Sequence, residues 1–67
     1  MNKDELYKCI IDSCNDWMPL EDIASSVERK YDYLLNYIIP TMLNEGLLER
    51  MYPDTPRHPN QKYKKKG

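Results

Sequence analysis

Apolar residues recur every three to four positions in the first part of the chain. Between Asp4 and Asn15, the side chains of Leu6, Ile10 and Cys14 are spaced four residues apart. This spacing places them on one face of an amphipathic α-helix. Two carboxylates fall in the first turn, where they favour the positive end of the helix dipole. We therefore predict a first helix over Asp4–Asn15.

A second, shorter helix is predicted to begin at Pro19 and to end near Ser26 or Val27. Its apolar face comprises Leu20, Ile23, Ala24 and Val27. Proline suits the first helical position because its missing N–H group needs no partner there. The preceding pair, Trp17 and Met18, interrupts the helical period and can form a short strand.

A third, longer helix is predicted over residues 31–45. It carries two neighbouring apolar ridges, Leu34–Ile38–Met42 and Leu35–Ile39–Leu43. Pro40 lies inside this helix, where it removes a backbone hydrogen bond at a cost of ~3 kcal/mol. Because the apolar period continues across it, we expect a kinked helix. Gly46 follows as the left-handed residue that closes the helix.

After Gly46 the apolar period changes from four residues to two. Leu48, Arg50 and Tyr52 face one way along a predicted strand, and their neighbours face the other. A proline-rich turn then leads to Gln61–Lys64, which alternates again. This second strand can return antiparallel to the first, with Tyr63 as its apolar anchor.

This order of elements predicts an α+β fold, a winged helix-turn-helix of three helices followed by a β-hairpin wing. The domain would span residues 1–64, and residues 65–67 would be a frayed basic tail. In this plan the third helix is the recognition helix and the hairpin loop is the wing.

The cysteines, the single histidine and the hydropathy of the chain argue against a disulfide, a zinc site and a membrane span. Cys9 and Cys14 fall in one helix with ~7.5 Å of rise between them, beyond the ~7 Å limit for a disulfide. We expect two reduced, buried thiols. One histidine is too few for a zinc site, which needs about four ligands, and no metal or cofactor is expected. No apolar run approaches the ~20 residues of a membrane span, so we predict a cytoplasmic protein with no membrane contact.

The formal net charge of −1 hides a strong segregation of charge. Residues 1–49 contain four Lys and Arg against ten Asp and Glu, whereas residues 50–67 contain six Lys and Arg against Asp54 alone. A basic end of this kind indicates an anionic partner more clearly than the average charge does.

Several short motifs are distributed over residues 20–64. They are Leu20-Glu21-Asp22-Ile23-Ala24, Asp32-Tyr33-Leu34-Leu35, Ile39-Pro40, Asn44-Glu45-Gly46-Leu47-Leu48-Glu49, Tyr52-Pro53-Asp54 and His58-Pro59-Asn60-Gln61-Lys62-Tyr63. Together they resemble the C-terminal winged-helix domain of bacterial Schlafen-type, divergent-AAA transcriptional regulators related to ATP-dependent helicases. Similar domains are attached to some Fic-type proteins. The resemblance implies a DNA-binding or regulatory accessory module.

Double-stranded DNA is the first partner that these residues predict. The predicted contacts are Arg29, Lys30, Tyr33, Asn36 and Tyr37 on the third helix and Arg57, His58, Lys62 and Lys64 on the wing. Arginine and asparagine can read base edges in the major groove, while basic side chains on the wing can clamp the phosphate backbone.

A protein-interaction module is the alternative. The chain has six tyrosines and one tryptophan but no phenylalanine, and tyrosine and tryptophan are favoured at interfaces. Tyr31, Tyr33 and Tyr37 could form a docking or dimer surface, for a second copy or for an attached ATP-binding or Fic-like domain. On this reading the lysine-rich end only keeps the protein soluble, and Asp32 opposes phosphate binding.

Catalysis is not predicted. His58 has no serine or cysteine near it in the chain, and a lone histidine is a weak candidate for a general base. The two glycines, Gly46 and Gly67, cannot form a glycine-rich phosphate loop.

Overall fold

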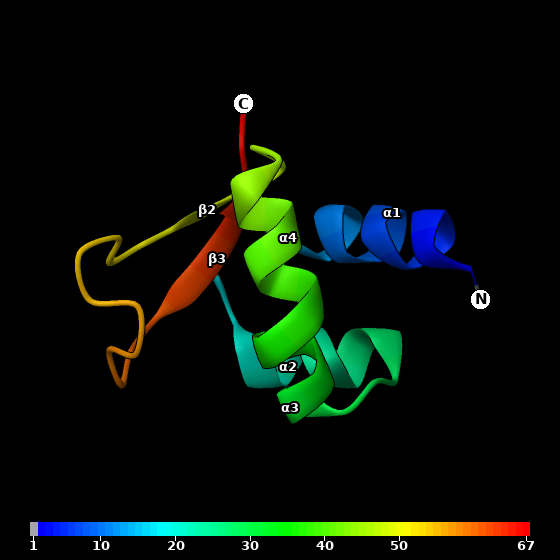
Figure 1. The fold of residues 1–67 in the computed structure, drawn as a ribbon, viewed down its shortest axis with the longest axis horizontal. Helices are drawn as coiled ribbons and strands as arrows, with labels where there is room; N and C mark the ends of the chain where they lie inside the picture. The colour runs from blue at the N-terminus through cyan, green and yellow to red at the C-terminus, as the bar shows by residue number, and fades with distance from the viewer. Residues whose placement is uncertain (1) are drawn as a thin grey trace.

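A computed structural model describes residues 2–67. The elements in chain order are α1 (Lys3–Ser13), β1 (Met18–Pro19), α2 (Leu20–Val27), α3 (Tyr31–Tyr33), η1 (Leu34–Ile38), α4 (Ile39–Asn44), β2 (Leu48–Arg50) and β3 (Lys62–Lys65). The segments α3, η1 and α4 follow each other without a break, and together we call them the third helix. Figure 1 shows α1 and the β2–β3 hairpin at opposite ends of the long axis, with the third helix between them. The α+β, winged-helix-like arrangement predicted from the sequence is confirmed.

The core lies where the helices meet one face of the sheet. Its buried members are Leu6, Ile10, Cys14, Leu20, Ile23, Ala24, Val27, Leu34, Ile38, Ile39, Met42, Leu48 and Tyr63. Each predicted helix therefore buries the apolar face that its period defined, and Tyr63 anchors the last strand as expected. The first helix begins at Lys3, where the Asn2 side chain accepts a hydrogen bond from the Glu5 N–H at 2.8 Å.

Pro19 occupies a different position from the one predicted. It is the N-cap of α2, with φ −63° and ψ 148°, rather than the first helical residue. It also pairs with Lys62 as part of β1. An extended N-cap and an edge strand both tolerate a residue that lacks an N–H group, so one proline can serve both elements.

Pro40 distorts the third helix through a π turn. Because proline has no N–H group, the regular hydrogen bond to the Asn36 carbonyl cannot form. The N–H of the preceding residue, Ile39, reaches back five residues to the Leu34 carbonyl. The Thr41 hydroxyl donates to the Tyr37 carbonyl at 2.9 Å. The expected kink is thus a π-helical segment, η1, that ends two residues before the proline.

Gly46 closes the third helix in the left-handed conformation that the sequence predicts, with φ +74°. The Gly46 N–H donates to the Leu43 carbonyl at 3.1 Å, and the Leu47 N–H donates to the Met42 carbonyl at 2.9 Å. These two bonds are the Schellman pattern, which satisfies carbonyls at the end of a helix. The helix ends at Asn44, one residue earlier than predicted.

The sheet is antiparallel, with strand order β1-β3-β2. Tyr63 is paired with Met18 on one side and with Arg50 on the other. β3 extends beyond residue 64, the predicted end of the domain, because Lys65 pairs with Leu48. The Lys65 N–H also donates to the Cys14 carbonyl at 2.8 Å, and the Lys66 N–H donates to the Leu47 carbonyl at 3.1 Å. Backbone pairing therefore holds two residues that were expected to fray.

Replacing Gly46 by alanine should destabilise the domain by about 1–2 kcal/mol, the cost of a left-handed conformation for a residue with a Cβ. A Cβ at this position would have no atom within 4 Å, so the cost is conformational and not steric. Urea unfolding monitored by circular dichroism measures the loss. Gly46→Asn should lose less, because asparagine tolerates the left-handed region. Equal stability of Gly46→Ala and the parent protein would contradict this account.

Cys9 and Cys14 are both free thiols, and Cys14 is buried. Burial raises the pKa of the Cys14 thiol from 9.0 to about 11. The unfolded chain therefore loses this proton at lower pH than the folded domain does. The resulting stability is fully present below the ordinary thiol pKa and is lost as pH rises toward 11.

We expect the free energy of unfolding to fall by on the order of 1–2 kcal/mol between about pH 8 and about pH 11 because of Cys14. Urea titrations across this range measure the change. The Cys14→Ala variant should show a flatter dependence, with a residual slope from Tyr63, whose pKa burial also raises. Parallel pH profiles for the two proteins would refute the assignment to Cys14.

Candidate interaction surfaces on the third helix and the wing

Tyr33 and Tyr37 form an exposed aromatic pair on the third helix. Their side chains are 44% and 68% exposed, and their ring centroids are 6.0 Å apart. They border a hollow of about 420 Å³ between the start of α1 and the third helix. It is lined by Asn2, Lys3, Leu6, Arg29, Tyr33, Tyr37 and Ile38. We call this region the tyrosine surface.

Tyr31 does not belong to the tyrosine surface. It is also exposed, but it borders a separate cleft next to the wing, together with Pro56 and Pro59. Residues two positions apart on a helix point about 200° away from each other, which separates Tyr31 from Tyr33. The expected cluster of three tyrosines is therefore a pair and a single residue on different sides of the helix.

Lys30 and Asn36, two more of the predicted contacts, are exposed. Lys30 is the N-cap of α3, and its side chain forms no capping hydrogen bond. Asn36 lies within the π turn. Asp32 is exposed between them on the same helix, so an anionic ligand here would meet a carboxylate as well as a cation.

The wing loop has a hydrogen-bonded interior centred on Gln61. The Gln61 side chain accepts from the Tyr52 N–H at 2.9 Å and donates to the Tyr52 carbonyl at 2.8 Å. The His58 ring stacks on Tyr52 with a centroid distance of 3.8 Å, and its Nδ1 accepts from the Asn60 N–H at 3.0 Å. His58 therefore has a structural role in shaping the loop, and Gln61, which the sequence did not single out, has the larger one.

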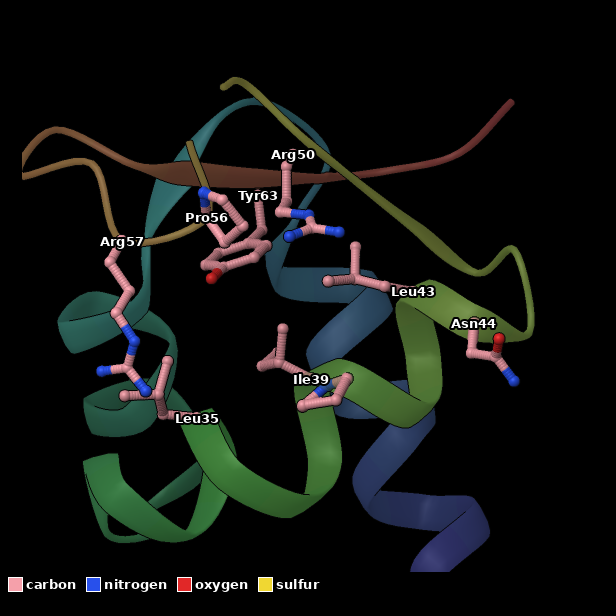
Figure 2. Close-up of a pocket in the computed structure, with 9 residues that line it drawn as sticks. Leu35, Ile39, Leu43, Asn44, Arg50, Pro56, Arg57 and Tyr63 are labelled. Carbon is pink, nitrogen blue, oxygen red and sulfur yellow. The ribbon is translucent and has the colours of Figure 1, made fainter. Parts of the chain in front are cut away.

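A cleft of about 550 Å³ separates the third helix from the wing. It is lined by Leu35, Ile39, Pro40, Leu43, Asn44, Arg50, Pro56, Arg57 and Tyr63. We call it the wing cleft. Figure 2 shows the aliphatic side chains along the helix on one side, with Tyr63 and the two arginines on the other. Arg57 was predicted as a wing contact, whereas Arg50 was not, although its alternation with the buried Leu48 already placed it on the inner face.

Lys62 and Lys64 lie on the opposite face of the sheet from the wing cleft. They flank Tyr63 in β3, and successive side chains of a strand point to opposite faces. The ammonium group of Lys64 lies 5.7 Å from the centre of the Trp17 ring. Glu49 is its cross-strand partner. Six of the nine predicted contacts are thus distributed over the tyrosine surface, the wing cleft and the outer face of the sheet, and Lys30, Asn36 and His58 belong to none of these three surfaces.

Tyr63 connects the wing cleft to the core. Its side chain is only 4% exposed, and burial raises the pKa of its hydroxyl, an effect that the nearby Arg50 charge partly offsets. The neutral phenol therefore remains a hydrogen-bond donor throughout the physiological pH range.

Within residues 2–67, no group of three or more His, Cys, Asp or Glu side chains is placed to hold a metal ion. None of the helices described there has the length and apolar character needed to cross a membrane.

Residues 18–65 match the family described as "Filamentation induced by cAMP protein Fic-like, C-terminal domain". The match covers more than two thirds of the 67-residue chain. The chain belongs to this family. The Fic-type part of the predicted resemblance is thereby confirmed, while its Schlafen-type part stays a prediction. No curated protein and no solved structure gave a significant match.

The Fic-like C-terminal family match begins at the first residue of β1 and ends at the last residue of β3. Every residue that lines the wing cleft lies inside it. The tyrosine surface, in contrast, includes Asn2, Lys3 and Leu6, which precede the matched segment.

Proposed function

We propose that this Fic-like C-terminal domain is a protein-interaction module that docks through its tyrosine surface. The observation that carries the proposal is the exposure of Tyr33 and Tyr37 side by side on one helix. In the described chain, the exposed large apolar side chains are Tyr31, Tyr33 and Tyr37. Tyrosines are favoured at interfaces because they combine apolar area with a polar tip.

The occupant we name is the Fic-like region of a protein of this family. The family description places such domains at the C-terminal end of Fic-like proteins, so a Fic-like region is the neighbour that they would meet. Lys3 and Arg29 line the hollow beside the tyrosines, and none of the residues 2–67 that line it is acidic. The partner surface should therefore offer carboxylates next to apolar groups.

Double-stranded DNA is a second candidate partner, supported by the basic outer face of the sheet. Lys62 and Lys64 project from the same face of β3, and the exposed Lys66 follows just after the strand. These side chains could contact phosphates. Because the nine predicted contacts do not share one surface, a backbone contact by the wing is better supported than base reading by the third helix.

For the docking proposal, we expect the 67-residue domain to bind a purified Fic-like region that lacks its own C-terminal domain. The Y33S/Y37S variant should bind at least about tenfold more weakly, because aromatic anchors dominate interface energetics. Isothermal titration calorimetry measures the affinities.

The Y31S variant is the matched control, because it removes an exposed tyrosine from another side of the same helix. It should bind within about twofold of the parent. No binding, or equal weakening by Y31S and Y33S/Y37S, would reject the proposal. Sedimentation velocity gives a further result: a dimer that Y33S/Y37S dissociates would show that the occupant is a second copy instead.

For the DNA candidate, we expect fluorescence anisotropy with a mixed-sequence duplex to show affinity that falls as salt increases. The K62Q/K64Q variant should reduce the slope of log K against log salt by about 1.8, or ~0.9 for each lost phosphate contact. K3Q/K8Q removes the same charge from α1 and should leave the slope unchanged. Absence of binding at low salt would eliminate this candidate.

A further inference from the structure

The wing cleft combines an apolar wall with cationic groups. Leu35, Ile39 and Leu43 succeed each other at four-residue intervals along the third helix and line the cleft together. Figure 2 shows them in a row facing the wing, with Arg50 beyond one edge of the Tyr63 ring and Arg57 beyond the other. A ligand that fills this cleft would therefore contact aliphatic side chains along its length and a guanidinium group at each end.

No carboxylate shares the wing cleft with the two guanidinium groups. Among residues 2–67, no Asp or Glu lines it. Glu21 borders the smaller neighbouring cleft, which Arg57 also lines. Arginine forms strong, directional hydrogen bonds with carboxylates, so both side chains are available to an external anion.

The Tyr63 hydroxyl is a further polar group that the cleft offers to a ligand. The residue is 4% exposed and lines both the wing cleft and its smaller neighbour. Among residues 2–67, the buried side-chain polar atom without a hydrogen-bond partner is the Tyr7 hydroxyl, not that of Tyr63. Figure 2 shows the Tyr63 hydroxyl directed into the cleft, where it can donate to an external acceptor.

From these observations we infer that the wing cleft binds a short, acidic, amphipathic helical segment of a partner protein. Apolar side chains of the segment pack on Leu35, Ile39 and Leu43. Its carboxylates accept hydrogen bonds from Arg50, Arg57 and the Tyr63 hydroxyl. The aliphatic row spans ~12 Å, or about two helical turns, which suits the apolar anchors of a helix bound in a groove.

The apolar wall favours a peptide over nucleic acid as the occupant. A phosphodiester backbone would meet the arginines but would leave the aliphatic row without an apolar partner, whereas an acidic amphipathic helix satisfies both. This inference goes beyond the docking role of the tyrosine surface. The two surfaces lie on different sides of the third helix, so Y33S/Y37S should retain peptide binding in the wing cleft.

The test is a selection from a phage-displayed library of randomised helical peptides of about 14 residues against the 67-residue domain. Enriched peptides should carry Asp or Glu beside apolar residues spaced three or four positions apart. Fluorescence anisotropy then measures one enriched peptide in synthetic form. Replacing its carboxylates by amides should weaken binding by about tenfold or more.

Variants of the domain locate the site. R50Q/R57Q should weaken binding by about tenfold or more, and Y63F, which keeps the ring, by a few-fold. K62Q/K64Q is the matched control, since it removes the same charge from the outer face of the same sheet and should change affinity by less than about twofold. Circular dichroism confirms that each variant remains folded.

A charge exchange completes the test. R50E/R57E should lose the acidic peptide and gain a peptide in which the same positions are lysine. The inference is overturned if selection yields no acidic amphipathic peptides, or if K62Q/K64Q weakens binding as much as R50Q/R57Q. Retained affinity of R50E/R57E for the acidic peptide would overturn it as well.

Discussion

β3 forms hydrogen bonds along both of its edges, to β1 ahead of α2 and to β2 after the third helix. β3 thereby connects the beginning of the matched family segment to the end of that segment. The two pairings also fix which side chains of β3 face the core and which face outward. With Tyr63 turned into the core, Lys62 and Lys64 must face outward. The positions of the wing cleft and of the basic outer face both follow from this one register, because a shift by a single residue would exchange them.

Much of this fold could be predicted from local patterns. The four-residue period of Leu34, Ile38 and Met42, the change of period at Gly46 and the anchor at Tyr63 each express a local preference that the tertiary structure also satisfies. Pro19 and the π turn were not predictable in the same way. The position of Pro19 depends on its pairing with Lys62, which is distant in the chain. The π turn depends on a choice between hydrogen-bonding registers that have the same apolar pattern.

The candidate site was harder to predict than the fold. The sequence identifies basic and tyrosine residues, but their grouping depends on the phase of each element and on which face another element covers. The helical period already separates Tyr31 from Tyr33, and the strand period already directs Arg50 inward. The stacking of His58 on Tyr52 and the two hydrogen bonds between the Gln61 side chain and the Tyr52 backbone were not predictable in this way, because the irregular path of the loop creates them.

The third helix thus separates two surfaces of different chemistry, an aromatic one beside α1 and an aliphatic, cationic one beside the wing. The most direct measurement is a NOESY spectrum of the domain. The account predicts cross-peaks from the Tyr63 ring to the Leu35 and Ile39 methyl groups, and from the Lys64 side chain to the Trp17 indole. Cross-peaks from Lys64 to the third helix, with Tyr63 near Trp17 instead, would show the opposite strand register and would contradict it.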